Sequence, residues 1–220
     1  MNIEADIFKK SRFIYDKVLK YGFIKEKDIY TLKTNILNNA FRVELIIKND
    51  TLSGKIYDLE FNEEYINYRI KNNNGKFVSV VREEYIKLLE DIRNNCCYSE
   101  PFIYPQTNRI NKYIYDKYKD NPEFLFDDDE TGVYRNKSSN KWYGIIMNIN
   151  KKKFDLDDKD IEVMNIKLDP LEIEELIKND GFYKAYHMNK KYWISIILDD
   201  TINDEIIYKL IDKSYVLVSK

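Results

Sequence analysis

The spacing of apolar side chains in this chain changes from helical to alternating and back to helical twice, and this order limits the fold more than any other feature. In the first half, apolar residues recur at helical spacing from Ile7 to Tyr21, alternate from Tyr30 to Ile47, and return to helical spacing from Val78 to Ile92. We therefore predict a helix, a hairpin with a further strand at residues 52–61, and a second helix. Both helices are expected to lie on one face of the sheet.

The second half of the chain repeats this order. Its apolar spacing predicts helices at residues 110–118, 170–180 and 207–218 and strands at residues 132–136, 141–149, 161–168 and 192–198. Asp169 is suited to cap the middle helix, Pro170 to begin it and Gly181 to end it.

A short segment bracketed by Pro101 and Pro105 separates the two halves. Proline fixes its own φ angle and lacks a backbone donor, so this pair is typical of a boundary between domains. We therefore expect two domains, residues 1–98 and 102–220. The predicted fold class is α+β, with two α/β sandwich domains, in each of which helices cover one face of a sheet.

The composition limits both the partners and the compartment. The 36 Lys and Arg residues nearly balance the 38 Asp and Glu residues, so no overall field of one sign attracts nucleic acid or membrane. No apolar run approaches the ~18 residues that a membrane span needs, and the first residues lack a signal-peptide pattern, which predicts a cytoplasmic protein without membrane partners. Cys96 and Cys97 are adjacent, which indicates free thiols.

Several enzyme classes lack their motifs in this chain. Its six glycines are dispersed, so no phosphate-binding glycine loop is present, and we expect no cofactor. There is one histidine, His187, and no Gly-x-Ser-x-Gly motif, so a hydrolase triad has no signalled nucleophile. The chain is therefore predicted not to be an enzyme.

Four segments in the second half form an ordered pattern. They are Trp142-Tyr143-Gly144, Asn165-Ile166-Lys167-Leu168-Asp169-Pro170, residues 183–196 with Tyr186-His187-Met188-Asn189-Lys190-Lys191-Tyr192-Trp193, and Leu210-Ile211-Asp212-Lys213-Ser214-Tyr215. From about Phe102 to Val218 this order resembles the MmcQ/YjbR family of small bacterial proteins. Residues 54–96 resemble the extra N-terminal domain of longer members. The resemblance implies a frataxin/CyaY-like sandwich, a shape also likened to a double-wing DNA-binding domain, so DNA binding follows only by analogy of fold.

The acidic run from Asp127 to Glu130 suggests a calcium loop, because oxygen ligands at alternate positions precede Gly132. The twelfth position is Ser138, however, where an EF-hand needs a bidentate Glu. A frataxin-like fold raises weak iron binding as an alternative. A solvated loop explains the run better, and we predict no metal site.

Between Gly132 and Phe154 the charged residues are all basic. They are Arg135, Lys137, Lys141, Lys151, Lys152 and Lys153, and Lys190 and Lys191 would join them if the two segments meet. A basic hairpin with aromatic residues can follow the phosphate backbone of double-stranded DNA as a wing. The alternative is a solvated hairpin that balances the acidic loops on either side of it.

The turn around the single histidine is the second candidate site. Tyr186, His187, Asn189 and Trp193 are expected to line a pocket of polar and aromatic groups. The alternative is that the His187 ring is buried, hydrogen bonded and structural. If it is functional, it should face a cleft.

Two functions stay open at this point. One is a non-enzymatic bacterial binding protein that contacts double-stranded DNA through the basic hairpin. The other is a module that binds a protein or a small ligand in the pocket around His187. An enzyme is the third possibility.

Overall fold

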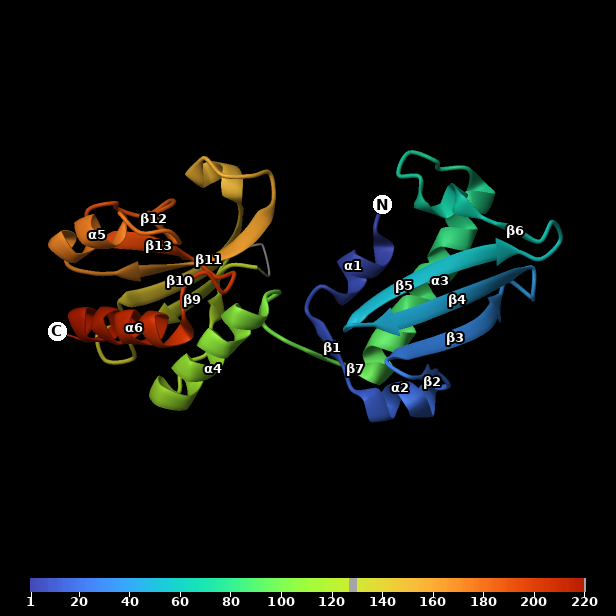
Figure 1. The fold of residues 1–220 in the computed structure, drawn as a ribbon, viewed down its shortest axis with the longest axis horizontal. Helices are drawn as coiled ribbons and strands as arrows, with labels where there is room; N and C mark the ends of the chain where they lie inside the picture. Colours follow the sequence, from blue (N-terminus) through green and yellow to red (C-terminus); the bar gives the residue numbers. More distant parts are fainter. Residues whose placement is uncertain (127–129, 220) are drawn as a thin grey trace. The chain divides into compact units, whose positions relative to one another are not determined.

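The computed structural model describes residues 1–126 and 130–219, so residues 127–129 of the acidic run lie outside the described part of the chain. Figure 1 shows the fold, in which the chain divides into two compact units, Met1–Glu100 and Pro101–Lys220. Each unit is α+β, and every strand pair within the described residues is antiparallel.

The N-terminal unit is built on a five-stranded sheet. Its strands, in spatial order, are β2 (Ile24–Glu26), β3 (Ile29–Ile36), β4 (Phe41–Lys48), β5 (Thr51–Asp58) and β6 (Glu63–Glu64). Alternate side chains of β4, from Phe41 to Ile47, are buried against the long helix α3 (Lys76–Cys96). The predicted hairpin and the second helix of this half are therefore confirmed.

The prediction of one helix over residues 7–21 is wrong. The structure has two short helices, α1 (Ile3–Phe8) and α2 (Tyr15–Tyr21), separated by the strand β1 (Ser11–Phe13). β1 pairs with β7 (Cys97–Ser99), which directly follows α3. Both helices bury side chains in the same core, so the apolar spacing looks continuous although the backbone between them is extended.

A buried ion pair joins α1 to the rest of this unit. The Glu4 carboxylate, 3% exposed, accepts from Nη1 (2.9 Å) and Nη2 (2.5 Å) of Arg69, at the end of the 3-10 helix η1 (Ile66–Arg69). Arg69 Nη2 also donates to the Gly54 carbonyl, and the Tyr85 hydroxyl donates to Glu4. A Cβ atom at position 54 would lie 1.9 Å from the Tyr85 oxygen, so this close approach requires glycine.

The C-terminal unit has a six-stranded sheet with helices on one face. The strands, in spatial order, are β12 (Phe182–Lys184), β13 (Trp193–Ile197), β11 (Asp160–Lys167), β10 (Trp142–Asn150), β9 (Gly132–Arg135) and β8 (Glu123–Phe124). The helices α4 (Pro105–Tyr118), α5 (Pro170–Leu176) and α6 (Asp204–Val218) bury their apolar side chains against one face. The arrangement of helices on one face is therefore as predicted for this unit.

Two details of the C-terminal unit differ from the prediction. The helix that begins at Pro170, with Asp169 as its cap, ends at Leu176 rather than at Gly181. Gly181 lies after a further turn, with φ +86°, a conformation that favours glycine. The short strands β8 and β12 were not predicted, because two or three residues carry too little alternation to be recognised.

Cys96 and Cys97 are free thiols, as predicted. Burial raises the pKa of Cys96 to about 11 and that of Cys97 to about 12, so both are protonated at neutral pH.

Within residues 1–126 and 130–219, no helix combines the length and the apolar character that crossing a bilayer requires.

Candidate functional site

The sheet face opposite the helices of the C-terminal unit carries the candidate site. Alternation along β10 directs Ile145 and Met147 to this face, whereas Gly144 and Ile146 belong to the helix-covered face. A β-bulge shifts the register between Trp142 and Gly144. Trp142 therefore lies on the same face as Ile145, which strict alternation would not allow.

Two buried polar side chains of the sheet hydrogen bond to the backbone of the turn after β12. Asn165 on β11 and Ser195 on β13 are fully buried, and the Ser195 hydroxyl donates to the Asn165 side-chain oxygen at 2.5 Å. Asn165 Nδ2 donates to the Tyr186 carbonyl at 2.9 Å, and the Tyr186 amide donates to Ser195 Oγ at 3.0 Å. Both backbone groups of Tyr186 are thus fixed, immediately before His187.

His187 has a left-handed backbone conformation, with φ +58°, and an exposed side chain. Its ring contacts the Tyr186 ring at 3.9 Å between centroids. The structure therefore favours the cleft-facing interpretation of His187 over the buried one. Within the described residues, no carboxylate, serine or cysteine side chain is hydrogen bonded to this ring.

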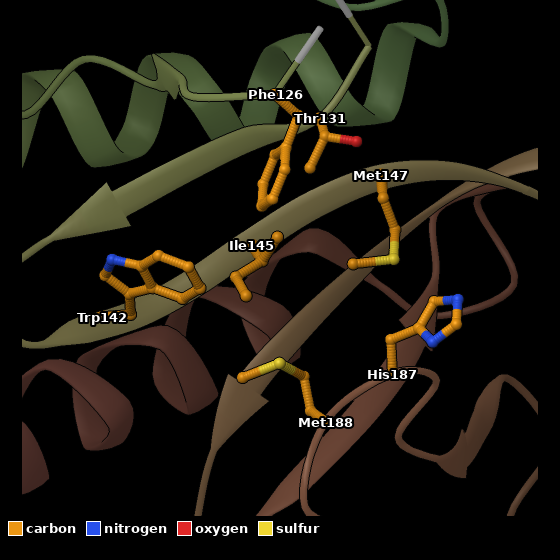
Figure 2. Close-up of a pocket in the computed structure, with 7 residues that line it drawn as sticks. All are labelled: Phe126, Thr131, Trp142, Ile145, Met147, His187 and Met188. Carbon is orange, nitrogen blue, oxygen red and sulfur yellow. The ribbon is translucent and has the colours of Figure 1, made fainter. Parts of the chain in front are cut away.

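Trp142, Met147, His187 and Met188 border a pocket of about 440 Å³, to which Phe126 and Thr131 also contribute. In Figure 2 these side chains surround Ile145, which forms the floor. Apolar and thioether groups make up most of the wall, and the lining residues with polar side-chain atoms are His187, Thr131 and Trp142, whose indole carries one N–H donor. Such a combination suits a small ligand with an apolar body and one polar end.

Only one of the four predicted pocket residues lines this pocket. His187 does, whereas Trp193 is buried beneath it in a cluster with Ile145. Tyr186 contacts an adjoining apolar cluster instead. Asn189 is exposed; its backbone carbonyl accepts from the amides of Tyr192 and Trp193 and so closes the turn.

Most of the residues that line the pocket were not predicted from the sequence. The alternation along residues 141–149 places Ile145 and Met147 on one face of the strand, and this pattern could have identified both as neighbours in the wall. Trp142 was assigned to the basic hairpin, because nothing in the sequence signals the bulge. Phe126 and Met188 come from loops, whose direction no periodicity predicts.

The predicted basic hairpin residues do not form one cluster. Arg135, Lys137 and Lys141 are at one end of β10, and the 3-10 helix η2 (Lys151–Phe154) is at the other. Nine strand residues at ~3.3 Å each separate the two groups by roughly 30 Å.

Four of these cations have carboxylate partners within the unit. The pairs, with their N to O distances, are Arg135 with Glu123 (3.3 Å), Lys137 with Asp120 (3.0 Å), Lys151 with Asp199 (3.1 Å) and Lys152 with Asp158 (2.6 Å). The hydrogen bond to Asp199 raises the pKa of Lys151, and the hydrogen bond from Lys152 lowers the pKa of Asp158. The four carboxylates partly neutralise the hairpin.

At the η2 end, the first basic segment meets the turn of the second. Lys153 Nζ lies 5.9 Å from the centre of the Tyr186 ring, and Phe154 stacks on Tyr183 at 4.5 Å. Lys190 and Lys191 follow Tyr186 on the same turn and are exposed. In the described part of the chain, Lys153, Lys190 and Lys191 have no carboxylate partner.

The segment from Leu210 to Tyr215, near the C-terminus, has a structural role. Ser214 is buried, accepts from the Lys167 amide at 2.9 Å and donates to the Tyr143 carbonyl at 2.6 Å. Asp212 accepts hydrogen bonds from Tyr113 and Tyr118 on α4. These contacts attach α6 to the sheet and to α4.

Across residues 1–126 and 130–219, no three His, Cys, Asp or Glu side chains are grouped to hold a metal.

The C-terminal unit is similar to known proteins. A family model described as YjbR matches residues 116–217, which include the whole pocket. The uncharacterized protein YyaQ of Bacillus subtilis (strain 168) is 36% identical over 109 residues, which are 48% of this chain and 92% of YyaQ.

Two solved structures of a Pseudomonas syringae protein are also similar. The crystal structure has 31% identity and a TM-score of 0.49, covering 50% of this chain and 96% of that chain. The solution NMR structure has 31% identity and a TM-score of 0.47, covering 51% and 91%. A Deinococcus radiodurans protein has 30% identity and a TM-score of 0.36, covering 46% and 69%.

Proposed function

This chain belongs to the YjbR family, and from that premise we propose that its C-terminal unit is a non-catalytic module that binds a small molecule in the pocket at His187. The observation that carries the proposal is the exposed imidazole at the edge of a mostly apolar pocket, on a turn whose backbone is fixed by Asn165 and Ser195. Pre-fixed polar groups beside apolar surface are typical of ligand sites, because little ordering is needed on binding.

The pocket favours a ligand with a flat apolar body. Ile145 supports such a body from below, and the Trp142 ring and the two thioethers contact its sides. The His187 imidazole would bond a polar or anionic group at the open edge. A non-catalytic role is supported by the lack, within the described residues, of a nucleophile or carboxylate hydrogen bonded to His187.

The pocket is tested with an anilinonaphthalene sulfonate dye, which has a flat apolar body and an anionic group. Both tryptophans of the chain report on the pocket, because Trp142 lines it and Trp193 lies beneath it. We expect saturable quenching of tryptophan fluorescence and a roughly 5-fold weaker affinity for His187→Asn, which loses one charge-assisted bond. Asn tolerates the left-handed backbone, so the free energy of unfolding should change by less than about 0.5 kcal/mol.

Lys119→Asn is the matched control, because Lys119 is also exposed and has φ +57° in the same unit but lies away from the pocket. Equal dye affinity in wild type, His187→Asn and the control would contradict the proposal. Loss of stability together with binding would show that His187 acts on the fold instead.

Double-stranded DNA is the second candidate, favoured by the meeting of Lys153 with the turn that carries Lys190 and Lys191. If these three side chains contact phosphates, the slope of log affinity against log salt should be about −3. Changing all three to Gln should remove this slope in fluorescence anisotropy with a labelled duplex, whereas Lys112→Gln with Lys209→Gln, on the helix-covered side, should not. Absence of binding at about 50 mM salt would reject DNA as the ligand.

A further inference from the structure

A second pocket lies in the N-terminal unit, at the edge of its sheet. β6 is the edge strand, and its register places Glu63 opposite Asp58 of β5. The Tyr65 amide then donates to the Ile56 carbonyl at 2.8 Å, so the chain stays attached to the sheet before η1 begins. This segment and the start of α3 enclose a pocket of about 390 Å³.

Aromatic rings form the walls of this pocket. The rings of Tyr65 and Phe77 are 6.4 Å apart between centroids and nearly perpendicular, at 83°, so they make a corner. Phe41 supports this corner from the core, with ring centroids 5.2 Å from Tyr65 and 5.9 Å from Phe77. Phe61 completes the wall and is 69% exposed, while Phe77 is 60% exposed. Phenylalanine rings this exposed, gathered in one hollow, indicate a contact surface.

The charged residues that line the pocket are all acidic. Asp58, Glu63 and Glu64 line the pocket, and the described lining includes no Lys or Arg. Glu64 is paired with Lys55 at 2.9 Å, whereas Glu63 is exposed and has no ion-pair partner among the described residues. Asp58 accepts from the amides of Glu60 and Phe61 and so orders the turn that carries the Phe61 ring.

We propose that this pocket binds an organic ammonium group. Ring faces are negative in their electrostatic potential and attract cations, most strongly cations that are weakly hydrated. Carboxylates beside the rings add attraction for positive charge and repel anions. A bare divalent ion would need a shell of oxygen ligands, which aromatic walls do not supply. The ammonium group can belong to a free alkylammonium compound or to a lysine side chain of a partner protein, since both present a positively charged nitrogen at the end of an alkyl chain.

The test compares choline with 3,3-dimethylbutan-1-ol, its uncharged counterpart of equal shape, on the full chain. Choline is expected to bind at least about 10-fold more tightly and to shift the ring resonances of Phe61 and Phe77 in NMR spectra. A third titration uses a short peptide with one unmodified lysine. Tighter binding of choline indicates a free ligand, and tighter binding of the peptide indicates a protein partner.

Three variants identify the site. Phe61→Leu should weaken choline binding about 5-fold through loss of a ring face, and Glu63→Gln about 3-fold through loss of one charge. Both side chains are exposed, so the fold should tolerate both changes. Phe124→Leu is the control, because Phe124 is an exposed aromatic residue of the other unit. Equal affinity for the two isosteres, no binding of either cation at about 20 mM, or no effect of Phe61→Leu would each overturn the proposal.

Discussion

Arg69→Met is expected to destabilise the N-terminal unit by about 3 to 5 kcal/mol, because it leaves the buried Glu4 carboxylate without its cation. Arg69 also bonds the Gly54 carbonyl, which loses that donor. Both tryptophans are in the C-terminal unit, so tryptophan fluorescence does not follow this change. Hydrogen exchange of the buried β4 amides, at Val43 and Leu45, measures the free energy of opening directly.

The effect of Arg69→Met should depend on pH. Burial by itself raises the pKa of Glu4, but the hydrogen bonds from Arg69 and Tyr85 outweigh it and leave the pKa below the ordinary value of 4.5. A depressed folded-state pKa gives stability that is present above pH 4.5 and is lost as the pH falls through the folded pKa. Without Arg69, Glu4 can fold in its neutral form, so the difference between wild type and variant should shrink below pH 4.5.

The double variant Glu4→Gln with Arg69→Met is the control for this argument. A neutral amide can still accept from Tyr85, so it should recover at least about 2 kcal/mol relative to Arg69→Met alone. If the double variant is as unstable as the single one, loss of packing around Arg69 explains the effect, and the unpaired charge does not.

Asn165→Ala is expected to destabilise the C-terminal unit by about 3 kcal/mol and to weaken ligand binding at the His187 pocket at least about 10-fold. The change leaves the buried Ser195 hydroxyl without its acceptor and the Tyr186 carbonyl without its donor. The turn that holds His187 is then attached to the sheet by fewer bonds. Chemical denaturation followed by tryptophan fluorescence gives the stability, and dye titration gives the affinity.

Ser138→Ala is the comparison for Asn165→Ala, because Ser138 is an exposed polar residue of the same unit in the β9–β10 turn, and it should have little effect on either quantity. An Asn165→Ala protein that is destabilised yet binds the dye as wild type would show that the His187 turn does not depend on the buried bonds.

The resemblance to the YjbR family and the positions of most of the longer strands and helices along the chain were predicted from the sequence. Period-two alternation from Tyr30 to Ile47 and helical spacing from Val78 to Ile92 each reflect one buried face, and such a face leaves a regular signal in the order of residues. The prediction of one helix failed at residues 7–21. Two short helices there pack on the same core, so their apolar residues have the spacing of one continuous helix.

The sequence singled out His187 but left both a pocket position and a buried structural position open, and the walls of the pocket beside it came from the tertiary structure. A bulge brings Trp142 beside Ile145, and the bonds of Asn165 and Ser195 to Tyr186 and to each other join residues that are 9 to 30 positions apart. Likewise, the length of β10 separates basic residues that look like one group in the sequence. Periodicity reports which face of an element is buried, but not which elements meet, because long-range contacts depend on register and on loop direction. The sequence by itself therefore determined the family and most of the longer elements of the fold, and only the tertiary structure decided which side chains share a site.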